Sequence, residues 1–185
     1  MDKIVRDKSA ENIFNEVRLK YLITNIKDFI EYDIAMDIKT MLNEVRTGKK
    51  LTKNKIVVGT LDNDIIEFLK DRGVVIHTTE IYLTSKGLSH LARDSKKKRG
   101  AGLSDDDILR IPKILSNYNF VYFENIKGKL NLFYCENKCD SVLKIVVDTK
   151  AVANRKEKVT LVKTAGYVES YNIENDKNNI EVVKR

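Results

Sequence analysis

The chain has 185 residues, of which 42% are hydrophobic and 33% charged, a balance that supports a folded core and excludes global disorder. Its formal net charge of +7 lies almost entirely in residues 51–185, which favours an anionic partner such as nucleic acid. No apolar run reaches the ~18–20 residues of a membrane span. The first residues, MDKIVRD, lack the apolar core of a signal peptide, so we expect a cytoplasmic protein.

Residues 9–47 have the apolar spacing of amphipathic helices. Asp33 suits the cap of a second helix, so we expect a helical hairpin. No polar constellation stands out in this segment, which favours a packing or oligomerising role. The basic stretch TGKKLTKNK that follows predicts a linker, and residues 1–54 are therefore expected to form a helical N-terminal arm.

Two strands are expected on either side of a short helix. Residues 55–58 and 74–83 are rich in β-branched side chains. Between them, Asp62 suits the start of a helix and Gly73 its end. His77 lies within the second expected strand, where a histidine is more often a solvent-facing residue than a ligand.

The stretch TSKGLSHLARDSKKKRGAG, residues 84–102, predicts a helix with two different faces. Leu88 and Leu91 lie on one face, and His90 and Arg93 lie on the other, at helical spacing. A dense basic run follows, made of Lys96, Lys97, Lys98 and Arg99. An imidazole that moves protons beside cations that hold phosphate suits chemistry on a phosphodiester. A run of lysine and arginine is most often a solvated surface, and a lone histidine is most often an ordinary surface residue.

The segment LSDDDILRIPKIL predicts a further helical region. Ser104 and Asp107 have the spacing of a capping box, and Pro112 predicts a kink or a restart. The three aspartates at 105–107 suggest a metal site, but capping and the helix dipole explain them more simply.

From residue 119 onward, four runs predict strands: FVYFE, LNLFYC, VLKIVVD and VTLVK. Gly128 suits a hairpin turn between the first two. Helices followed by strands with short connections indicate an α+β fold with a four-stranded, mostly antiparallel sheet. We assign this domain to residues 55–175 and a polar tail to residues 176–185.

No cofactor or metal site is expected from the ligand-type residues. Cys135 and Cys139 are the only cysteines, and their spacing supplies half of a zinc site at most. His77 and His90 are isolated from them and from each other. We expect two reduced thiols.

Several motifs together resemble the phage-associated branch of the barnase–EndoU–colicin–RelE-like nuclease superfamily. They are EIYLTSKGLSHLARDSKKKRG, LSDDDILRIPKIL, KGKLNLFYC with KIVVD, and LVKTAGYV, and the resemblance covers about residues 56–172. It implies a barnase- or RelE-like α+β domain with helices packed on the sheet. It also implies a metal-independent, toxin-type ribonuclease, either phage-associated or part of a polymorphic toxin, with an immunity protein or antitoxin as partner. The site residues that it implies are His90, Arg93, Thr164 and Tyr167.

The expected reaction is endonucleolytic cleavage of RNA, tRNA or mRNA, by attack of the 2′-OH, which leaves a cyclic phosphate. His90 would transfer a proton and Arg93 would grip the phosphate. The expected RNA-binding residues are Lys96, Lys97, Lys98 and Arg99. Thr164 would donate a hydrogen bond to the phosphate, and Tyr167 would stack on a base or donate a hydrogen bond from its hydroxyl.

Two alternatives remain open at this point. A non-catalytic phage protein that binds nucleic acid or a host protein would have the same charge distribution. An accessory structural protein would assemble through residues 9–47 and have no affinity for nucleic acid.

Overall fold

The computed structural model describes residues 2–93, 102–126, 128–138, 141–152, 157–169 and 180–184, with the backbone alone for residues 2–11 and 14. The predicted RNA-binding residues Lys96, Lys97, Lys98 and Arg99 lie outside these ranges, as does Cys139. The chain divides into two compact units, Met1–Asp33 and Ile34–Arg185, and the boundary between these units falls inside the first helix. The predicted domain boundary at residue 54 stays a prediction.

Helix α1 runs without interruption over Asp2–Thr47, and the predicted helical hairpin is therefore wrong. Residues 2–47 contain neither glycine nor proline, so nothing in the backbone enforces a break. A lone aspartate such as Asp33 costs a helix interior only about 0.5 kcal/mol. The helix ends where Gly48 adopts a φ of 65°, a conformation that favours glycine.

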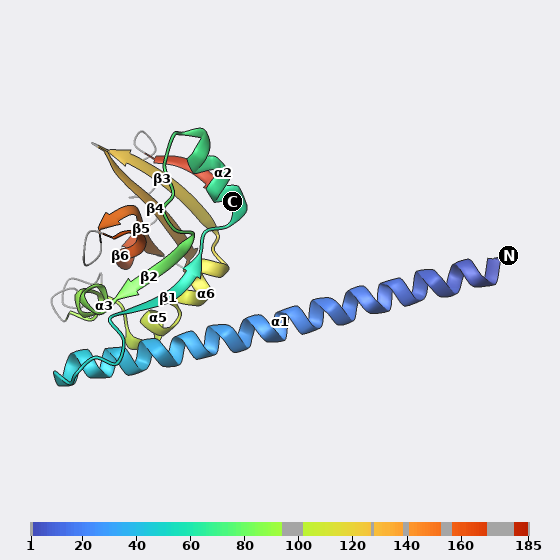
Figure 1. Ribbon diagram of the computed structural model, residues 1–185, viewed down its shortest axis with the longest axis horizontal. Helices are drawn as coiled ribbons and strands as arrows, with labels where there is room; N and C mark the ends of the chain where they lie inside the picture. Colours follow the sequence, from blue (N-terminus) through green and yellow to red (C-terminus); the bar gives the residue numbers. More distant parts are fainter. Residues whose placement is uncertain are drawn as a thin grey trace. The chain divides into compact units, whose positions relative to one another are not determined.

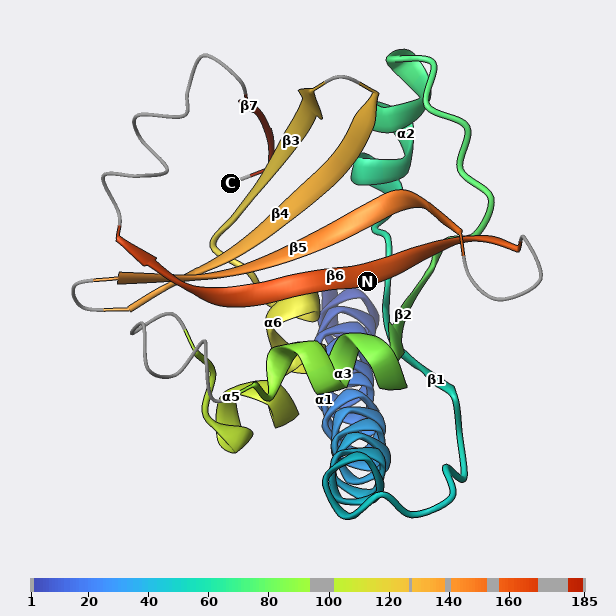
Figure 2. The same ribbon diagram turned by 90° about the vertical axis from the view of Figure 1, so that its left-hand side faces the viewer.

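The second unit is built on one seven-stranded sheet with the strand order β1-β2-β6-β5-β4-β3-β7 (Figures 1 and 2). The strands are β1 (Lys55–Thr60), β2 (Glu80–Thr84), β3 (Phe120–Ile126), β4 (Lys129–Asn137), β5 (Ser141–Val152), β6 (Lys158–Glu169) and β7 (Ile180–Lys184). Strands β3 to β6 form an antiparallel meander. The predicted four-stranded sheet is wrong, because β1, β2 and β7 extend this meander and β2 runs parallel to β6.

The added strands join the sheet through partners that are distant in sequence. Ile81 of β2 lies opposite Thr160 of β6, and Glu181 of β7 lies opposite Phe123 of β3. A local pattern shows which face of a strand is apolar, but it does not show which distant strand lies beside it. The partner of β2 and the addition of β7 were therefore not visible in the local pattern.

Four short helices pack with the end of α1 on one face of the sheet. They are α2 (Asn63–Asp71), α3 (Ser85–Leu91), α5 (Asp105–Leu109) and α6 (Ile111–Ser116). Figure 2 shows α3, α5 and α6 on the same side of β5 and β6. One apolar core joins them to the sheet, and its members include Met41, Ile65, Leu88, Leu91, Ile108, Ile114, Leu143, Ile145 and Val147.

The opposite face of the sheet carries a smaller apolar cluster. It consists of Phe133, Cys135, Val142 and Val146. Because side chains alternate along a strand, Leu143 and Ile145 of β5 face the helices while Val142 and Val146 face away. Each face of the sheet therefore has its own apolar cluster, and a side chain packs against the residues on its own face.

Several local predictions are confirmed. Ser104 and Asp107 form a capping box at the start of α5, and Pro112 lies in the first turn of α6. Gly128 has a φ of 77° in the turn between β3 and β4. The strand predicted over residues 74–83 is present only from Glu80 onward, and His77 lies in an irregular, exposed segment.

None of the helices in the described part of the chain has an apolar stretch long enough to cross a bilayer.

Candidate functional site

Helix α3, which carries His90, is held closely against strand β6. Its N-cap is Thr84, whose hydroxyl accepts a hydrogen bond from the amide of Gly87 at 3.0 Å. A Cβ atom at Gly87 would lie 3.4 Å from the carbonyl oxygen of Val162 on β6. Leu88 and Leu91 are almost completely buried. Glycine at the contact and two leucines in the core together fix the position of this helix.

His90 lies in the last turn of α3, and Arg93 lies two residues beyond the end of the helix at Leu91. His90 is half-buried and is the last-turn basic residue of the helix, and Arg93 is exposed just after it. The buried Leu91 lies between them in sequence and anchors the backbone, while His90 is partly exposed. The two predicted site residues are thus close along the chain, shortly before the basic run, which lies outside the described residues.

Thr164 lies on the other face of the sheet from α3. It is opposite Val146 in the β5–β6 register, and Val146 belongs to the small apolar cluster with Phe133. Its neighbour Ala165 belongs to the core that contains Leu88 and Leu91 of α3. Alternation along β6 therefore separates Thr164 from the face that carries His90. The structure does not bring these two predicted site residues together.

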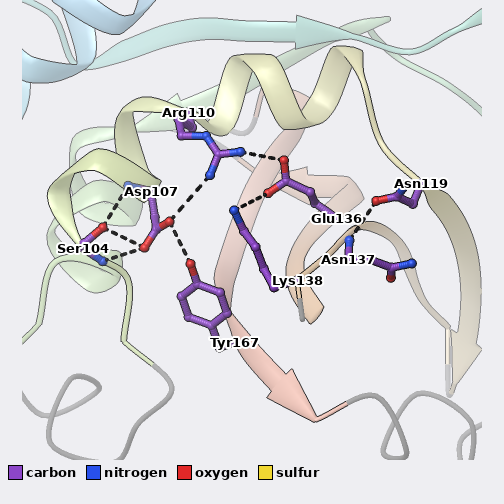
Figure 3. A network of polar contacts seen from close by, with 8 residues as sticks. All are labelled: Ser104, Asp107, Arg110, Asn119, Glu136, Asn137, Lys138 and Tyr167. Carbon is purple, nitrogen blue, oxygen red and sulfur yellow. Dashed lines mark hydrogen bonds and ion pairs between the residues drawn. The ribbon is translucent and has the colours of Figure 1, made fainter. Parts of the chain in front are cut away.

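Tyr167 faces the helices, and its hydroxyl is already engaged. It donates a hydrogen bond to Oδ1 of Asp107 at 2.8 Å (Figure 3). Burial, followed by this bond to a carboxylate, raises the pKa of Tyr167 to about 12. The phenol is thus neutral at ordinary pH and holds the end of β6 against α5.

The two oxygens of the Asp107 carboxylate accept hydrogen bonds from two different residues. Oδ2 accepts hydrogen bonds from the amide and hydroxyl of Ser104, at 3.1 and 2.7 Å, which complete the capping box. Oδ1 accepts from Tyr167. Burial opposes ionisation, but the hydrogen bonds from Ser104 and Tyr167 outweigh it and hold the pKa of Asp107 below its ordinary value.

An ion-pair chain continues from Asp107 to the end of β4 (Figure 3). Nη2 of Arg110 donates to Oε1 of Glu136 at 2.6 Å, and Nη1 lies 3.9 Å from Oδ1 of Asp107. Oε2 of Glu136 is buried, and Nζ of Lys138 lies 3.3 Å from it, in an ion pair rather than a well-aligned hydrogen bond. Two anions and two cations thus join α5 to the ends of β4 and β6.

Sequence reasoning missed this network except for the capping box. Arg110 caps the end of α5, whereas Glu136 and Lys138 lie at the end of β4, and no short motif connects the two places. Only the register of the sheet, which places Glu136 and Tyr167 on the helix-facing side, could have indicated it.

Asp105, Asp107 and Cys135 belong to the groups that were considered as metal ligands, and the structure gives each of them another environment. Asp105 accepts two hydrogen bonds from Arg46 of α1, at 2.5 and 2.6 Å, and Asp107 belongs to the network above. Cys135 is buried on the face away from the helices, and burial raises the pKa of its thiol to about 12. Within the described ranges, no three His, Cys, Asp or Glu side chains lie together in a way that could hold a metal ion.

Comparison with protein-family models finds no match to this chain, and comparisons with curated proteins and with solved structures find none either. The resemblance to the barnase–EndoU–colicin–RelE-like nucleases therefore rests on the sequence motifs alone.

Proposed function

We propose that the second unit is a metal-independent endoribonuclease in which His90 transfers a proton and Arg93 contacts the phosphate. The observation that carries this proposal is the placement of the partly exposed His90 in the last turn of a helix that is fixed in the core, with the exposed Arg93 two residues beyond the end of that helix. A proton-transfer group must be held in position while it stays accessible to substrate. The anchored end of α3 meets both requirements.

RNA is the substrate class that fits these residues. RNA supplies its own nucleophile, the 2′-OH, so cleavage needs only a base, an acid and charge stabilisation at phosphorus. A guanidinium such as that of Arg93 can contact two phosphate oxygens at once. The net charge of +7, with a basic run directly after Arg93, favours association with a polyanion.

The other two predicted site residues, Tyr167 and Thr164, do not carry this proposal. Tyr167 is held by Asp107, so its contribution would be positional unless substrate displaces that bond. The predicted contact of Thr164 with phosphate stays a prediction, since its side chain lies on the opposite face of the sheet from α3. The proposal therefore rests on His90 and Arg93. The cytoplasm, where RNA is abundant, is the proposed place of action, and an immunity protein or antitoxin is the proposed partner.

A second candidate function is RNA binding without cleavage. It is favoured by the separation of Thr164 from His90 and by the engagement of the Tyr167 hydroxyl, because the four-residue site implied by the resemblance does not assemble on one face. The same basic segment would then bind RNA with no turnover.

The two functions are separated by incubating the protein with total bacterial RNA in EDTA and analysing the product ends. Discrete fragments with 2′,3′-cyclic phosphate ends would support the nuclease. A substrate with a single 2′-deoxy nucleotide at the mapped cut would resist cleavage, since it lacks the nucleophile. Retention of the RNA on the protein with no fragments would support the binding function.

A further inference from the structure

Helix α1 carries a stripe of exposed apolar side chains in the first unit. The stripe consists of Leu19, Leu22, Ile23, Ile26, Phe29 and Ile30, and their exposed fractions range from 47% to 65%. Residues 19, 22, 26 and 29 alternate at intervals of three and four, the spacing of a coiled-coil seam. Ile23 and Ile30 widen the seam on one side. We call these six residues the α1 stripe.

The stripe is too apolar to be an ordinary solvated helix face. Six large apolar side chains fall within twelve consecutive residues, and three of them are isoleucines, which favour helix less than leucine or alanine. Most helix stability in proteins comes from burial of an apolar face rather than from propensity. A contiguous exposed apolar surface of this kind marks an interaction site.

The charge around the stripe distinguishes between classes of partner. Residues 15–33 contain three basic residues, Arg18, Lys20 and Lys27, against four acidic ones, Glu16, Asp28, Glu31 and Asp33, for a net charge of −1. The whole chain, by contrast, has a charge of +7. A helix that lies on anionic lipid is rich in lysine and arginine on its polar face, and RNA requires the same. The local charge therefore favours a protein surface.

We propose that the α1 stripe is the contact surface for the α1 stripe of a second copy of this chain. A two-fold contact matches the length and chemistry of the stripe automatically, because the same surface is present on both chains. Burial of one Leu, Ile or Phe side chain removes roughly 60–120 Å² from water. Twelve such side chains give roughly 700–1,400 Å², and the upper end of this range reaches the ~1,200 Å² at which stable interfaces begin. The pairing does not depend on RNA cleavage.

Sedimentation equilibrium of the full chain over a range of concentrations tests the proposal. The wild-type protein is expected to approach twice the 21.3 kDa mass of one chain. Ile26→Lys places a charge in the centre of the stripe and is expected to raise the dimer dissociation constant at least ~10-fold. Thr24→Lys is the matched control, because it adds the same charge at an exposed position outside the stripe.

Near-UV circular dichroism checks that the second unit is folded in both variants, since both substitutions lie in the first unit. A wild-type protein that stays monomeric at every concentration would overturn the proposal. Equal dimer dissociation constants for Ile26→Lys and Thr24→Lys would also overturn it. A monomer that co-sediments with phosphatidylglycerol vesicles would show that the stripe binds lipid instead.

Discussion

The hydroxyl of Tyr167 on β6 donates a hydrogen bond to Oδ1 of Asp107 on α5, across 2.8 Å. Removal of the hydroxyl in Tyr167→Phe leaves a half-buried carboxylate with one donor fewer. We expect a loss of about 1.5–3 kcal/mol in the free energy of unfolding, the usual range for a hydrogen bond to a charged group. Urea denaturation measures it. Tyr32→Phe deletes a hydroxyl from an exposed residue and is expected to change stability by less than ~0.5 kcal/mol. Equal effects of the two substitutions would contradict the role of this bond.

Acid is expected to weaken the same contact. The pKa of Asp107 in the folded protein lies below its ordinary value of 3.8, so its contribution to stability is complete above about pH 4. That contribution is lost as the pH falls through the lower pKa of the folded state. The stability difference between wild type and Asp107→Asn, followed by thermal unfolding from pH 6 to pH 2, is therefore expected to shrink as the pH falls. A difference that is constant over this range would contradict the ionised, hydrogen-bonded state of Asp107.

Removal of the Tyr134 hydroxyl is expected to change the free energy of unfolding in the opposite direction. The Tyr134 side chain is 1% exposed, and its hydroxyl has no hydrogen-bond partner among the residues that the structure describes. Burial of an unpaired hydroxyl is unfavourable, so Tyr134→Phe is expected to leave stability unchanged or to raise it by about 1 kcal/mol. The neighbouring Tyr118 donates to Asp62 at 2.6 Å, and Tyr118→Phe is expected to lose about 1 kcal/mol or more. Urea denaturation of Tyr134→Phe and Tyr118→Phe measures both free energies of unfolding. A loss of stability in Tyr134→Phe as large as in Tyr118→Phe would show that the Tyr134 hydroxyl has a hydrogen-bond partner.

The basic run after α3 is expected to determine how RNA binding depends on salt. Each phosphate contact on a single strand contributes about 0.7 to the slope of log K against log salt concentration. Replacement of Lys96, Lys97, Lys98 and Arg99 by glutamine is therefore expected to reduce the slope by about 3. The control replaces four exposed lysines elsewhere, namely Lys39, Lys49, Lys50 and Lys70. Fluorescence anisotropy with a single-stranded RNA measures both slopes. An equal reduction in the two proteins would remove any special role of the run.

Local sequence signals predicted many elements of this fold but not their long-range pairing. The end of α2 at Gly73, the capping box at Ser104 and the turn at Gly128 depend on residues a few positions apart, and all three are present. The parallel contact of β2 with β6 and the addition of β7 depend on distant partners. An α+β fold could therefore be predicted, whereas a seven-stranded mixed sheet could not.

In the candidate site, too, local relationships could be predicted in part from the sequence, whereas contacts between distant residues could not. Helical spacing predicted that His90 and Arg93 share one face of a helix, but α3 ends at Leu91 and Arg93 lies beyond it. Thr164 and Tyr167 are three positions apart on a strand, where an odd separation places side chains on opposite faces. The salt bridge between Arg110 and Glu136 joins residues in different elements and had no local signal.

The central claim is that His90 transfers a proton during RNA cleavage, and the most direct measurement is a single-turnover cleavage rate in EDTA for His90→Ala beside His77→Ala. His77 is the matched control, because it is the only other histidine and lies exposed in the segment between α2 and β2. The account predicts a rate loss of about 100- to 10,000-fold for His90→Ala, the usual range for a general acid or base, and an unchanged rate for His77→Ala. A wild-type rate in folded His90→Ala would contradict it.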